Sequence, residues 1–261
     1  MTELMRRAHA GHVDPRPSRR SGFQGLAFAF ALLPCLAAPS HAQLQPRISI
    51  DDPSWRLESS SDGIALYTSS VRGAGVVPFK AVMTIPGSIE DVSLVLEDIP
   101  RRGEWINHLG GSVLLERRND YDQVEYVHAE VPWPASDRSA VIRARITVSD
   151  DLSKATIAAE SVESHMADAL PVLVRAKVYA STFQMTKRGD RVEVVALVFI
   201  DPCGSIPKWI VNFYTHRVAR STLGGLRRQV ARRLYSPAQI AAMHQRMQAY
   251  RAFRERNPGA Q

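Results

Sequence analysis

Few side chains in this sequence have both the type and the spacing that catalysis needs. The histidines beyond residue 43 lie far apart, and no pair of them has the HxH or HExxH spacing of a metal site. The sequence also contains no Gly-x-Ser-x-Gly nucleophile elbow and no glycine-rich phosphate loop. We therefore expect no metal ion, no cofactor and no catalytic residue. The histidines concerned are His108, His128, His165, His216 and His244.

Cys203 is the one remaining candidate nucleophile. It stands between Pro202 and Gly204, in a sequence typical of a turn. Nothing beside it in the sequence would lower the pKa of its thiol, and only the thiolate is strongly nucleophilic. We interpret Cys203 as a small turn residue.

Length and composition limit the class of protein. The chain has 261 residues, of which 45% are hydrophobic and 23% charged. This is ordinary globular composition, and it excludes a disordered chain, a collagen-like chain and a coiled coil. Two cysteines cannot form a disulfide-rich scaffold or a zinc ribbon.

The first 42 residues have the pattern of an export signal. Five arginines in residues 1–22 precede an apolar run from Phe23 to Ala38, and small residues occupy Ser40 and Ala42. A secretory signal peptide has this order, with cleavage after the last small residue. We therefore expect a periplasmic or secreted protein cut after Ala42. A retained membrane anchor is the alternative, but the run is short and is interrupted by proline.

Basic residues are concentrated at the C-terminal end. Residues 208–261 hold eleven basic side chains and one acidic one, whereas residues 43–207 carry a net charge of −6. Arginines such as Arg227 and Arg232 either form the solvated face of a helix or contact anionic lipid headgroups transiently. Nucleic acid is a poor third alternative for an exported protein.

Hydrophobic periodicity predicts helices at three places. Residues 88–98 begin with the N-cap residue Ser88 and have Asp91 three positions later. A long helix is expected from Ser205 to about Tyr235, and a weaker one over 237–256. Alternating segments predict strands at Gly63–Thr68, Phe79–Ile85, Ser112–Arg117, Gln123–Val131, Ala140–Val148, Ala155–Ser161, Arg175–Met185 and Val192–Ile200.

The order of these elements and several short motifs resemble the START lipid-transfer domain. The most specific motifs are Pro132-Trp133-Pro134 followed by Asp137-Arg138, and the stretch from Asp201 to Asn212, which reads DPCGSIPKWIVN. Weaker matches lie at Asp62–Tyr67, Phe79–Ala81, Arg101–Trp105, Val124–Tyr126 and Val174-Arg175.

The resemblance implies an α+β, helix-grip fold in residues 43–235, with residues 236–261 as a basic helical tail. In this fold a curved antiparallel sheet wraps a long C-terminal helix around an internal cavity. The implied function is non-catalytic binding and transfer of a lipid or other hydrophobic molecule by a monomer. Helix-grip relatives also include cyclases and hydrolases, which keeps an enzyme acting on a hydrophobic substrate as the alternative.

The resemblance also implies which residues line the cavity. The C-terminal helix and the loop over 162–172 are expected to cover its mouth. The expected lipid-binding residues are Trp105, Val127, Ala129, Trp133, Ala140, Ile142, Ala144, Met166, Leu170, Trp209, Ile210 and Phe213.

One position departs from the family pattern. Many animal members carry a buried arginine six residues beyond the Asp-Arg motif, paired with a carboxylate on the neighbouring strand. Here that position is Ala144, and strand alternation places Arg143 and Arg145 on the opposite face. Glu125 stands at the carboxylate's position and is expected to lack that partner.

Overall fold

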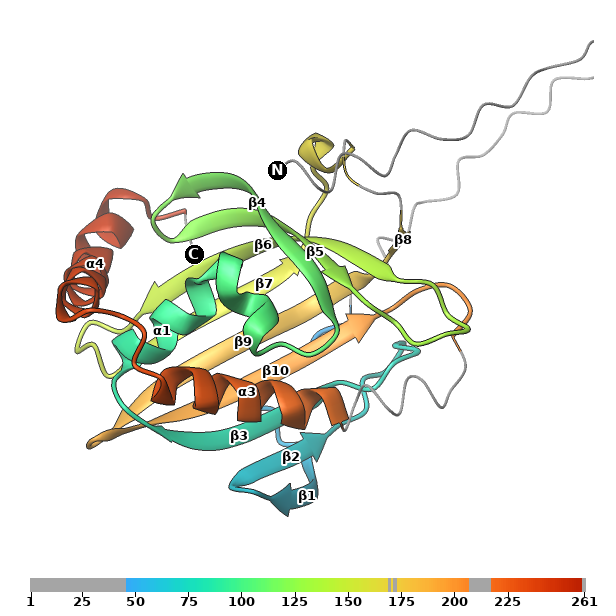
Figure 1. Cartoon of the computed structure of the whole chain (residues 1–261), viewed down its shortest axis with the longest axis horizontal. Coiled ribbons are helices and arrows are strands. Elements are labelled where there is room, and N and C mark those ends of the chain that lie inside the picture. The colour runs from blue at the N-terminus through green and yellow to red at the C-terminus, as the bar shows by residue number, and fades with distance from the viewer. Residues whose placement is uncertain (1–45, 169, 171–172, 207–216, 260–261) are drawn as a thin grey trace, which may run out of the picture. The chain divides into compact units, whose positions relative to one another are not determined.

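The computed structural model describes residues 46–168, 170, 173–206 and 217–259 of the chain. Ten strands of this part form one sheet in the order β1-β2-β3-β10-β9-β7-β6-β5-β4, and β8 pairs in parallel with β6 (Figure 1). The other pairs are antiparallel. The strands are β1 (Arg56–Ser61), β2 (Ile64–Thr68), β3 (Phe79–Pro86), β4 (Leu109–Asn119), β5 (Asp122–Ala129), β6 (Arg138–Val148), β7 (Lys154–Ser161), β8 (Val174–Arg175), β9 (Lys177–Arg188) and β10 (Arg191–Asp201).

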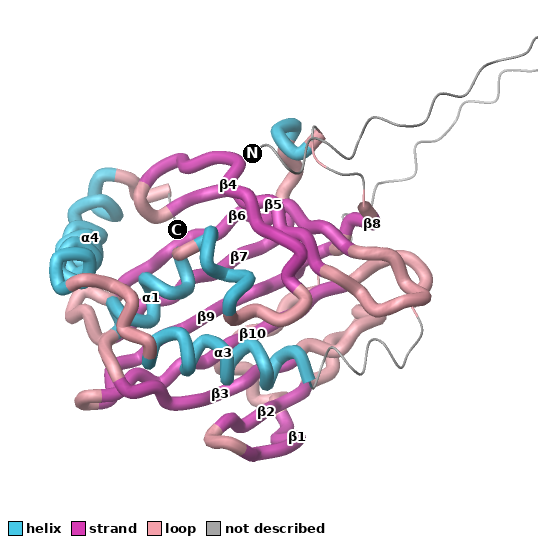
Figure 2. The backbone as a smooth tube through the Cα atoms, in the orientation of Figure 1, coloured by secondary structure: helices cyan, strands magenta, loops and turns pink. Residues whose placement is uncertain are grey.

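The helices α1 (Ile89–Glu97) and α3 (Ala219–Ala231) lie along one face of this curved sheet (Figure 2). We call this face, which carries Met83 and Ile85 of β3 and packs against α1 and α3, the inner face. The helical elements are α1 (Ile89–Glu97), η1 (Ile99–Glu104), η2 (His165–Ala167), α3 (Ala219–Ala231) and α4 (Pro237–Arg256). The predicted α+β fold with an antiparallel sheet around a C-terminal helix is confirmed.

The predicted capping signal of α1 is present. The backbone N–H of Asp91 donates to Ser88 Oγ at 3.1 Å, and the backbone N–H of Ser88 donates to Asp91 Oδ2 at 2.9 Å. This reciprocal pair satisfies two of the donors that a helix leaves free at its start. The expected helix over 88–98 therefore forms almost within its predicted bounds.

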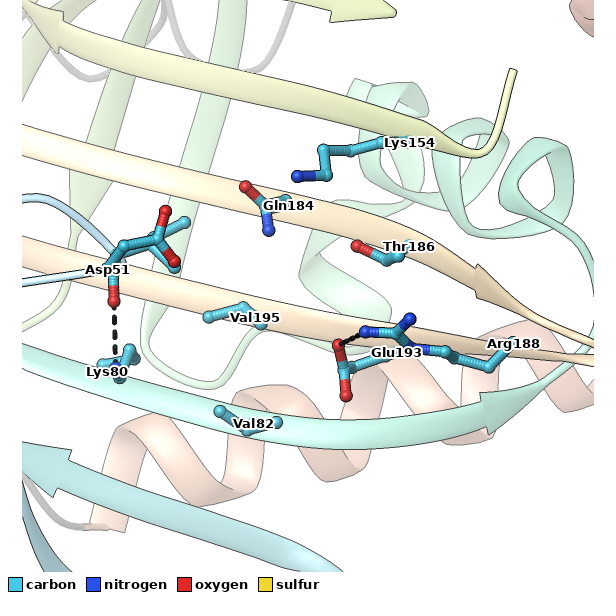
Figure 3. Close-up of a pocket in the computed structure, with 10 residues that line it drawn as sticks. Asp51, Lys80, Val82, Lys154, Gln184, Thr186, Arg188, Glu193 and Val195 are labelled. Atoms are coloured by element: carbon cyan, nitrogen blue, oxygen red, sulfur yellow. Dashed lines mark hydrogen bonds and ion pairs between the residues drawn. The ribbon is translucent and has the colours of Figure 1, made fainter. Parts of the chain in front are cut away.

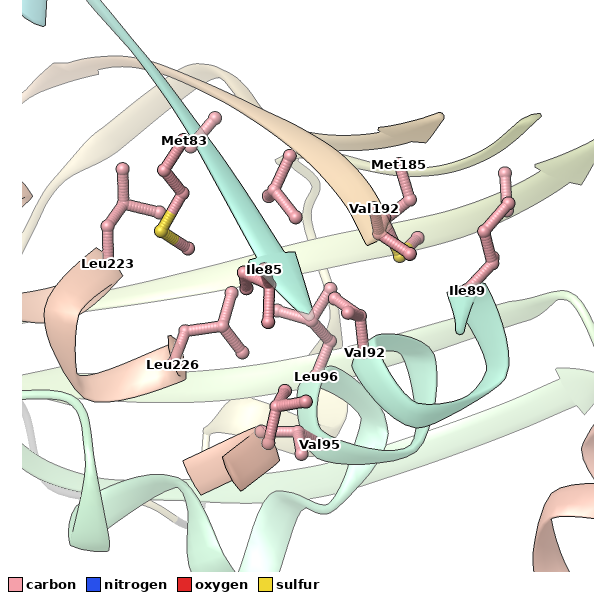
Figure 4. Close-up of a cluster of buried hydrophobic side chains, with 14 of the residues drawn as sticks. Met83, Ile85, Ile89, Val92, Val95, Leu96, Met185, Val192, Leu223 and Leu226 are labelled. Atoms are coloured by element: carbon pink, nitrogen blue, oxygen red, sulfur yellow. The ribbon is translucent and has the colours of Figure 1, made fainter. Parts of the chain in front are cut away.

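The main core lies where α1 and α3 meet β3 and β10. Leu223 and Leu226 of α3 pack with Met83 of β3, and Val92 of α1 lies in the same cluster (Figure 4). These side chains are almost fully excluded from water. Burial of each large apolar side chain contributes roughly 1.5–3 kcal/mol to folding.

A glycine allows α3 to approach η1 closely. A Cβ atom added at Gly225 would lie 2.2 Å from the carbonyl oxygen of Trp105, far inside van der Waals contact. The indole of Trp105 is itself buried in the main core. The position of α3 on this core therefore depends on the missing side chain at residue 225.

The structure differs from the predictions at the ends of the sheet and of the last long helix. β1 was not predicted, because an edge strand of sequence RLESSS has no buried face and so no apolar alternation. β8 is only two residues long. The described part of the long helix ends at Ala231, earlier than Tyr235, and residues 207–216 lie outside the description.

The segment after α3 is an ordered helix packed against α1. Met243, Met247 and Tyr250 of α4 are buried in the main core. Its capping box joins Ser236 to Gln239, whose backbone N–H donates to Ser236 Oγ at 3.3 Å. Residues 236–259 are thus a packed part of the unit formed by residues 44–261, where the sequence predicted a basic helical tail separate from the domain.

The predicted signal peptide, residues 1–42, lies outside the described residues. Of the helices that the structure does describe, none has the length and apolar character needed to cross a membrane.

Candidate functional site

The inner face of the sheet continues beyond the main core. The register places Ile142 of β6 opposite Glu125 of β5 on one side and Ser161 of β7 on the other. Ala159 of β7 lies opposite Ser181 of β9 in the same way. Because directly opposite residues point to the same face, these five side chains share the inner face with Met83 and Ile85.

This continuation is apolar and only half-buried, in contrast to the part beneath α1 and α3. Side chains from six neighbouring strands contribute to it, so it forms a broad, continuous surface. Part of this apolar surface is still in contact with water, so covering it with an apolar ligand is favourable in free energy. Its apolar members are Phe79, Ile146, Ile157 and Phe183, which border the main core and pack against it, and Val127, Ile142, Ala159 and Val198, which lie further out.

A buried ion pair lies at the β5 side of this surface. The carboxylate of Glu125 is fully excluded from water. It accepts two hydrogen bonds from the guanidinium of Arg102, from Nη1 and, at 3.2 Å, from Nη2. The amide of Gln123 donates a third at 2.6 Å. A buried carboxylate needs such partners, because an unpaired charge would cost several kcal/mol.

The same guanidinium is fixed from its other side by α1. Nε and Nη2 of Arg102 both donate to the carbonyl oxygen of Leu96, at 3.2 and 3.0 Å. A guanidinium has five N–H groups, and these contacts use four. One N–H on Nη1 has no partner among the described residues. Ser112 Oγ, buried opposite Val127 on the inner face, likewise has no partner there.

The expectation for Glu125 is thus half right. No arginine of β6 pairs with it, because Arg143 binds Asp122 on the outer face and Arg145 binds Glu160. Its partner Arg102 instead lies in η1. Because η1 is a helical turn and not a strand, the alternation of side chains along strands does not predict this contact. The Arg101–Trp105 motif in the sequence contains this residue, but spacing alone did not connect it to Glu125.

Most of the predicted inner residues on β5 and β6 lie on the inner face. The register places Ala140 opposite Val127 and Ala144 opposite Gln123. Ile142 and Ala129 follow the same alternation, and all of them are buried or half-buried. Whether they contact a ligand stays a prediction.

Three other predicted residues lie elsewhere. Trp133 is 88% exposed at the tip of the β5–β6 loop and does not line the interior. Met166 is 46% exposed on η2. Leu170 packs with Val124 and Tyr126, which point away from Glu125 by strand alternation. The described part of the 162–172 segment therefore packs on the outer face and forms no lid over the inner face.

The remaining predicted residues divide into two groups. Trp105 belongs to the main core, where it packs beneath α3 and not along the half-buried surface. Trp209, Ile210 and Phe213 lie outside the described residues. Nothing in the described structure bears on their contacts.

The structure gives no support to a nucleophile or a metal site. Burial raises the pKa of the Cys203 thiol, and the negative charge of Asp201 adds to this effect. At neutral pH the group is therefore a thiol and not a thiolate. In the described ranges, no three histidine, cysteine or acidic side chains cluster as metal ligands do.

A hollow lies on the outer face of β3, β10, β9 and β7, away from α3 (Figure 3). Its volume is about 540 Å³, but seven of its ten lining residues are polar or charged. Arg188 pairs with Glu193 at 3.0 Å, and Lys80 donates to the carbonyl oxygen of Ile50 at 2.9 Å. Charged side chains such as Lys80, Lys154 and Arg188 are poorly suited to contact apolar chains, so the inner face is the better site for an apolar ligand.

Comparison with known proteins shows the class to which this site belongs. The START domain family model matches residues 37–234, three quarters of the chain. The chain therefore belongs to the START domain family, whose members generally bind and transfer lipids or other hydrophobic ligands.

Individual relatives agree with this family. The chain is 26% identical to an uncharacterized protein of Pseudomonas aeruginosa, over 69% of this chain and 88% of that one. It is 25% identical to the phosphatidylcholine transfer protein of Mus musculus, over 66% of this chain and 81% of that one. A solved STAR-related lipid transfer protein fragment from Xanthomonas axonopodis is 26% identical, with a TM-score of 0.59 over 68% of this chain and 99% of that chain.

Proposed function

We propose that this protein binds a lipid or another hydrophobic small molecule against the inner face of its sheet and transfers it without chemical change. The observation that carries this proposal is the half-buried apolar surface that extends beyond the main core over six strands. On the β5 side it ends at the polar residues around Arg102 and Glu125. An apolar surface with a few convergent polar groups is the usual design of a small-molecule site.

The polar end suggests the kind of ligand. The N–H of Arg102 and the hydroxyl of Ser112 that have no partner among the described residues would bind an ester, phosphate or hydroxyl oxygen, while the apolar chains lie along Ile142 and Phe183. A phospholipid has both parts, a polar headgroup with ester and phosphate oxygens and two apolar chains. The relative named as a phosphatidylcholine transfer protein makes phosphatidylcholine the first ligand to test.

Exchange with a membrane requires a surface that contacts lipid. Five large apolar side chains are exposed at one end of the strands, where β3, β6 and β9 begin and β5, β7 and β10 end. Trp133 is the most prominent, and tryptophan favours the interface between water and acyl chains. We assign membrane contact to this end. Its exposed members are Val77, Trp133, Met166, Val174 and Ile200.

The arginines of α3 are less suited to the membrane contact expected from the sequence. Arg227 donates to the carbonyl oxygen of Asp62 at 2.8 Å, and Arg220 donates to Ser59 Oγ at 2.7 Å. Arg232 pairs with Glu104. These contacts within the protein compete with anionic headgroups for the same guanidinium groups.

Lipid extraction tests the proposal directly. The purified protein should carry or take up one phosphatidylcholine molecule from vesicles, as measured by mass spectrometry of an organic extract. Ala159→Trp should block this uptake, because Ala159 is half-buried on the inner face. Ala158→Trp is the matched control, since Ala158 is exposed on the opposite face. Equal uptake by both variants, or turnover of the lipid to a product, would contradict the proposal.

We further propose that the chain is exported and cleaved after Ala42. The support is the basic, apolar and small-residue pattern of residues 1–42. N-terminal sequencing of the protein from a periplasmic fraction should begin at Gln43. Recovery of an uncut chain with the membranes would show a retained anchor instead.

A further inference from the structure

The helix α4 is an addition to the domain that the family model describes. The match ends at residue 234, and α4 begins at Pro237. Figure 1 shows α4 beside α1 and the β4–β5 hairpin. The ring of Tyr121, in the turn of that hairpin, lies 5.0 Å from the ring of Tyr250 and 4.7 Å from that of Phe253. The helix is therefore held to two separate elements of the domain.

Arg246 makes a polar contact with each of these two elements. Its guanidinium pairs with Glu97 in the last turn of α1. Its backbone carbonyl oxygen accepts a hydrogen bond from the hydroxyl of Tyr121 at 2.7 Å. The Arg246–Glu97 pair is largely buried, so its loss would leave a poorly hydrated carboxylate.

Each of these two elements is close in sequence to a residue that forms or holds the buried ion pair on the inner face. Glu97 follows Leu96, whose carbonyl oxygen holds the guanidinium of Arg102 through two hydrogen bonds. Tyr121 stands on the other side, four residues before Glu125 in continuous chain. Arg246 thus fixes the separation between the segment that holds the arginine and the strand that holds the glutamate.

A second polar contact holds the end of α1, in addition to the Arg246–Glu97 pair. The hydroxyl of Tyr235, between α3 and α4, donates to Asp98 Oδ2 at 2.9 Å, one residue beyond Glu97. Burial of this phenol, with Asp98 as its acceptor, raises its pKa, so it stays protonated and donating at neutral pH. The end of α1 is held at two consecutive residues by the segment that follows α3.

We infer that Arg246 is a positioning residue for the Arg102–Glu125 pair, and that α4 thereby sets the geometry of the polar end of the inner face. The step from this geometry to ligand affinity rests on the proposed function. The positioning itself does not, because every contact that defines it lies within the protein chain.

A ligand-free measurement tests the positioning. The side-chain Nε–H of Arg102 is held by Leu96, and its NMR signal and exchange with water report on that contact. Arg246→Met removes the charge and keeps the apolar stem, and should speed this exchange by about tenfold. Arg254→Met is the matched control, because Arg254 also joins α4 to the domain, through Asp150 at 2.8 Å, but contacts neither α1 nor Tyr121 through any polar group of its side chain.

Two further variants separate positioning from general loss of stability. Arg246→Lys keeps a positive charge near Glu97 and should restore much of the slow exchange. Tyr121→Phe keeps the ring contacts and removes only the hydrogen bond to Arg246, so a smaller effect in the same direction is expected. If Arg246→Met and Arg254→Met change the Arg102 signal equally, or neither changes it, the inference is wrong.

The effect on ligand binding is tested by measuring lipid uptake from vesicles of pure phosphatidylcholine. Arg246→Met should weaken uptake by about tenfold relative to Arg254→Met, which corresponds to the size of coupling that remote contacts provide. Uptake that is equal in both variants, with Arg102 displaced only in Arg246→Met, would overturn the link to affinity and leave the positioning intact. If the unchanged protein takes up no lipid, the proposed function fails and the Arg102 signal still decides the inference.

Discussion

The guanidinium of Arg138 donates a hydrogen bond at 2.8 Å to the carbonyl oxygen of Pro202, 64 positions later in the chain. It also donates to the carbonyl oxygens of Ser136 and Cys203. This one side chain joins the β5–β6 loop to the turn that follows β10. The Asp-Arg and Asp-Pro-Cys-Gly motifs, far apart in the sequence, are thus two halves of one contact.

Replacing this arginine should destabilise the protein even with the charge retained. Arg138 is only 5% exposed, and lysine cannot supply three donors in the same plane. Arg138→Lys should lower the free energy of unfolding by about 2–4 kcal/mol. Arg145→Lys, on the same strand but in an exposed pair with Glu160, should cost less than about 1 kcal/mol. Denaturant titration measures both, and equal costs would show that the three carbonyl contacts contribute little.

Replacing each of two adjacent glycines in α3 by alanine should change the stability of the protein in opposite directions. A Cβ at Gly225 meets the backbone of Trp105, which cannot move away easily, so Gly225→Ala should lower stability by about 1–3 kcal/mol. At Gly224 the nearest atom is the flexible end of Arg228 at 3.4 Å. There the better helix propensity of alanine should raise stability by about 0.5–1 kcal/mol. Thermal unfolding of the two variants distinguishes these signs, and a gain at both positions would contradict the close contact.

Acid should loosen the base of the β5–β6 loop. The backbone N–H of Val131 and the ring of His128 hold the pKa of Asp137 below its usual value of 3.8. A carboxyl whose pKa is lowered by folding stabilises the protein fully above the usual value and loses this contribution as the pH falls through the lowered one. Unfolding free energies below pH 3.8 should therefore fall more steeply for the unchanged protein than for Asp137→Asn. Equal slopes for the unchanged protein and Asp137→Asn would contradict this contribution of Asp137.

Trp133 should affect lipid transfer more than lipid binding. Its side chain is almost fully exposed at the apolar end of the sheet, so Trp133→Ala removes little from the core. Transfer of fluorescent phosphatidylcholine between vesicles should slow by about five- to tenfold, because the interfacial contact is lost. The amount of lipid bound at equilibrium should stay the same. Val113→Ala, an exposed apolar change on β4, should leave the transfer rate unchanged, and an equal loss in both variants would argue against a specific contact.

The sequence by itself determined the fold and much of the face that carries the site. The capping box at Ser88 predicts where α1 begins, because its two hydrogen bonds join residues three positions apart. Alternation along β6 predicts that Ala140, Ile142 and Ala144 share a face, because a strand turns successive side chains to opposite sides. Both signals are local, and local geometry does not depend on the rest of the chain.

The tertiary structure alone decided which distant groups meet. Glu125 pairs with Arg102 because η1 folds over β5, and no periodicity in either segment specifies that contact. Leu170 packs behind the sheet, although its apolar side chain suits either face. Trp133 is exposed for a similar reason, since the path of a loop and not its composition places it in water. Contacts between remote segments depend on packing and loop geometry, which a single sequence does not display.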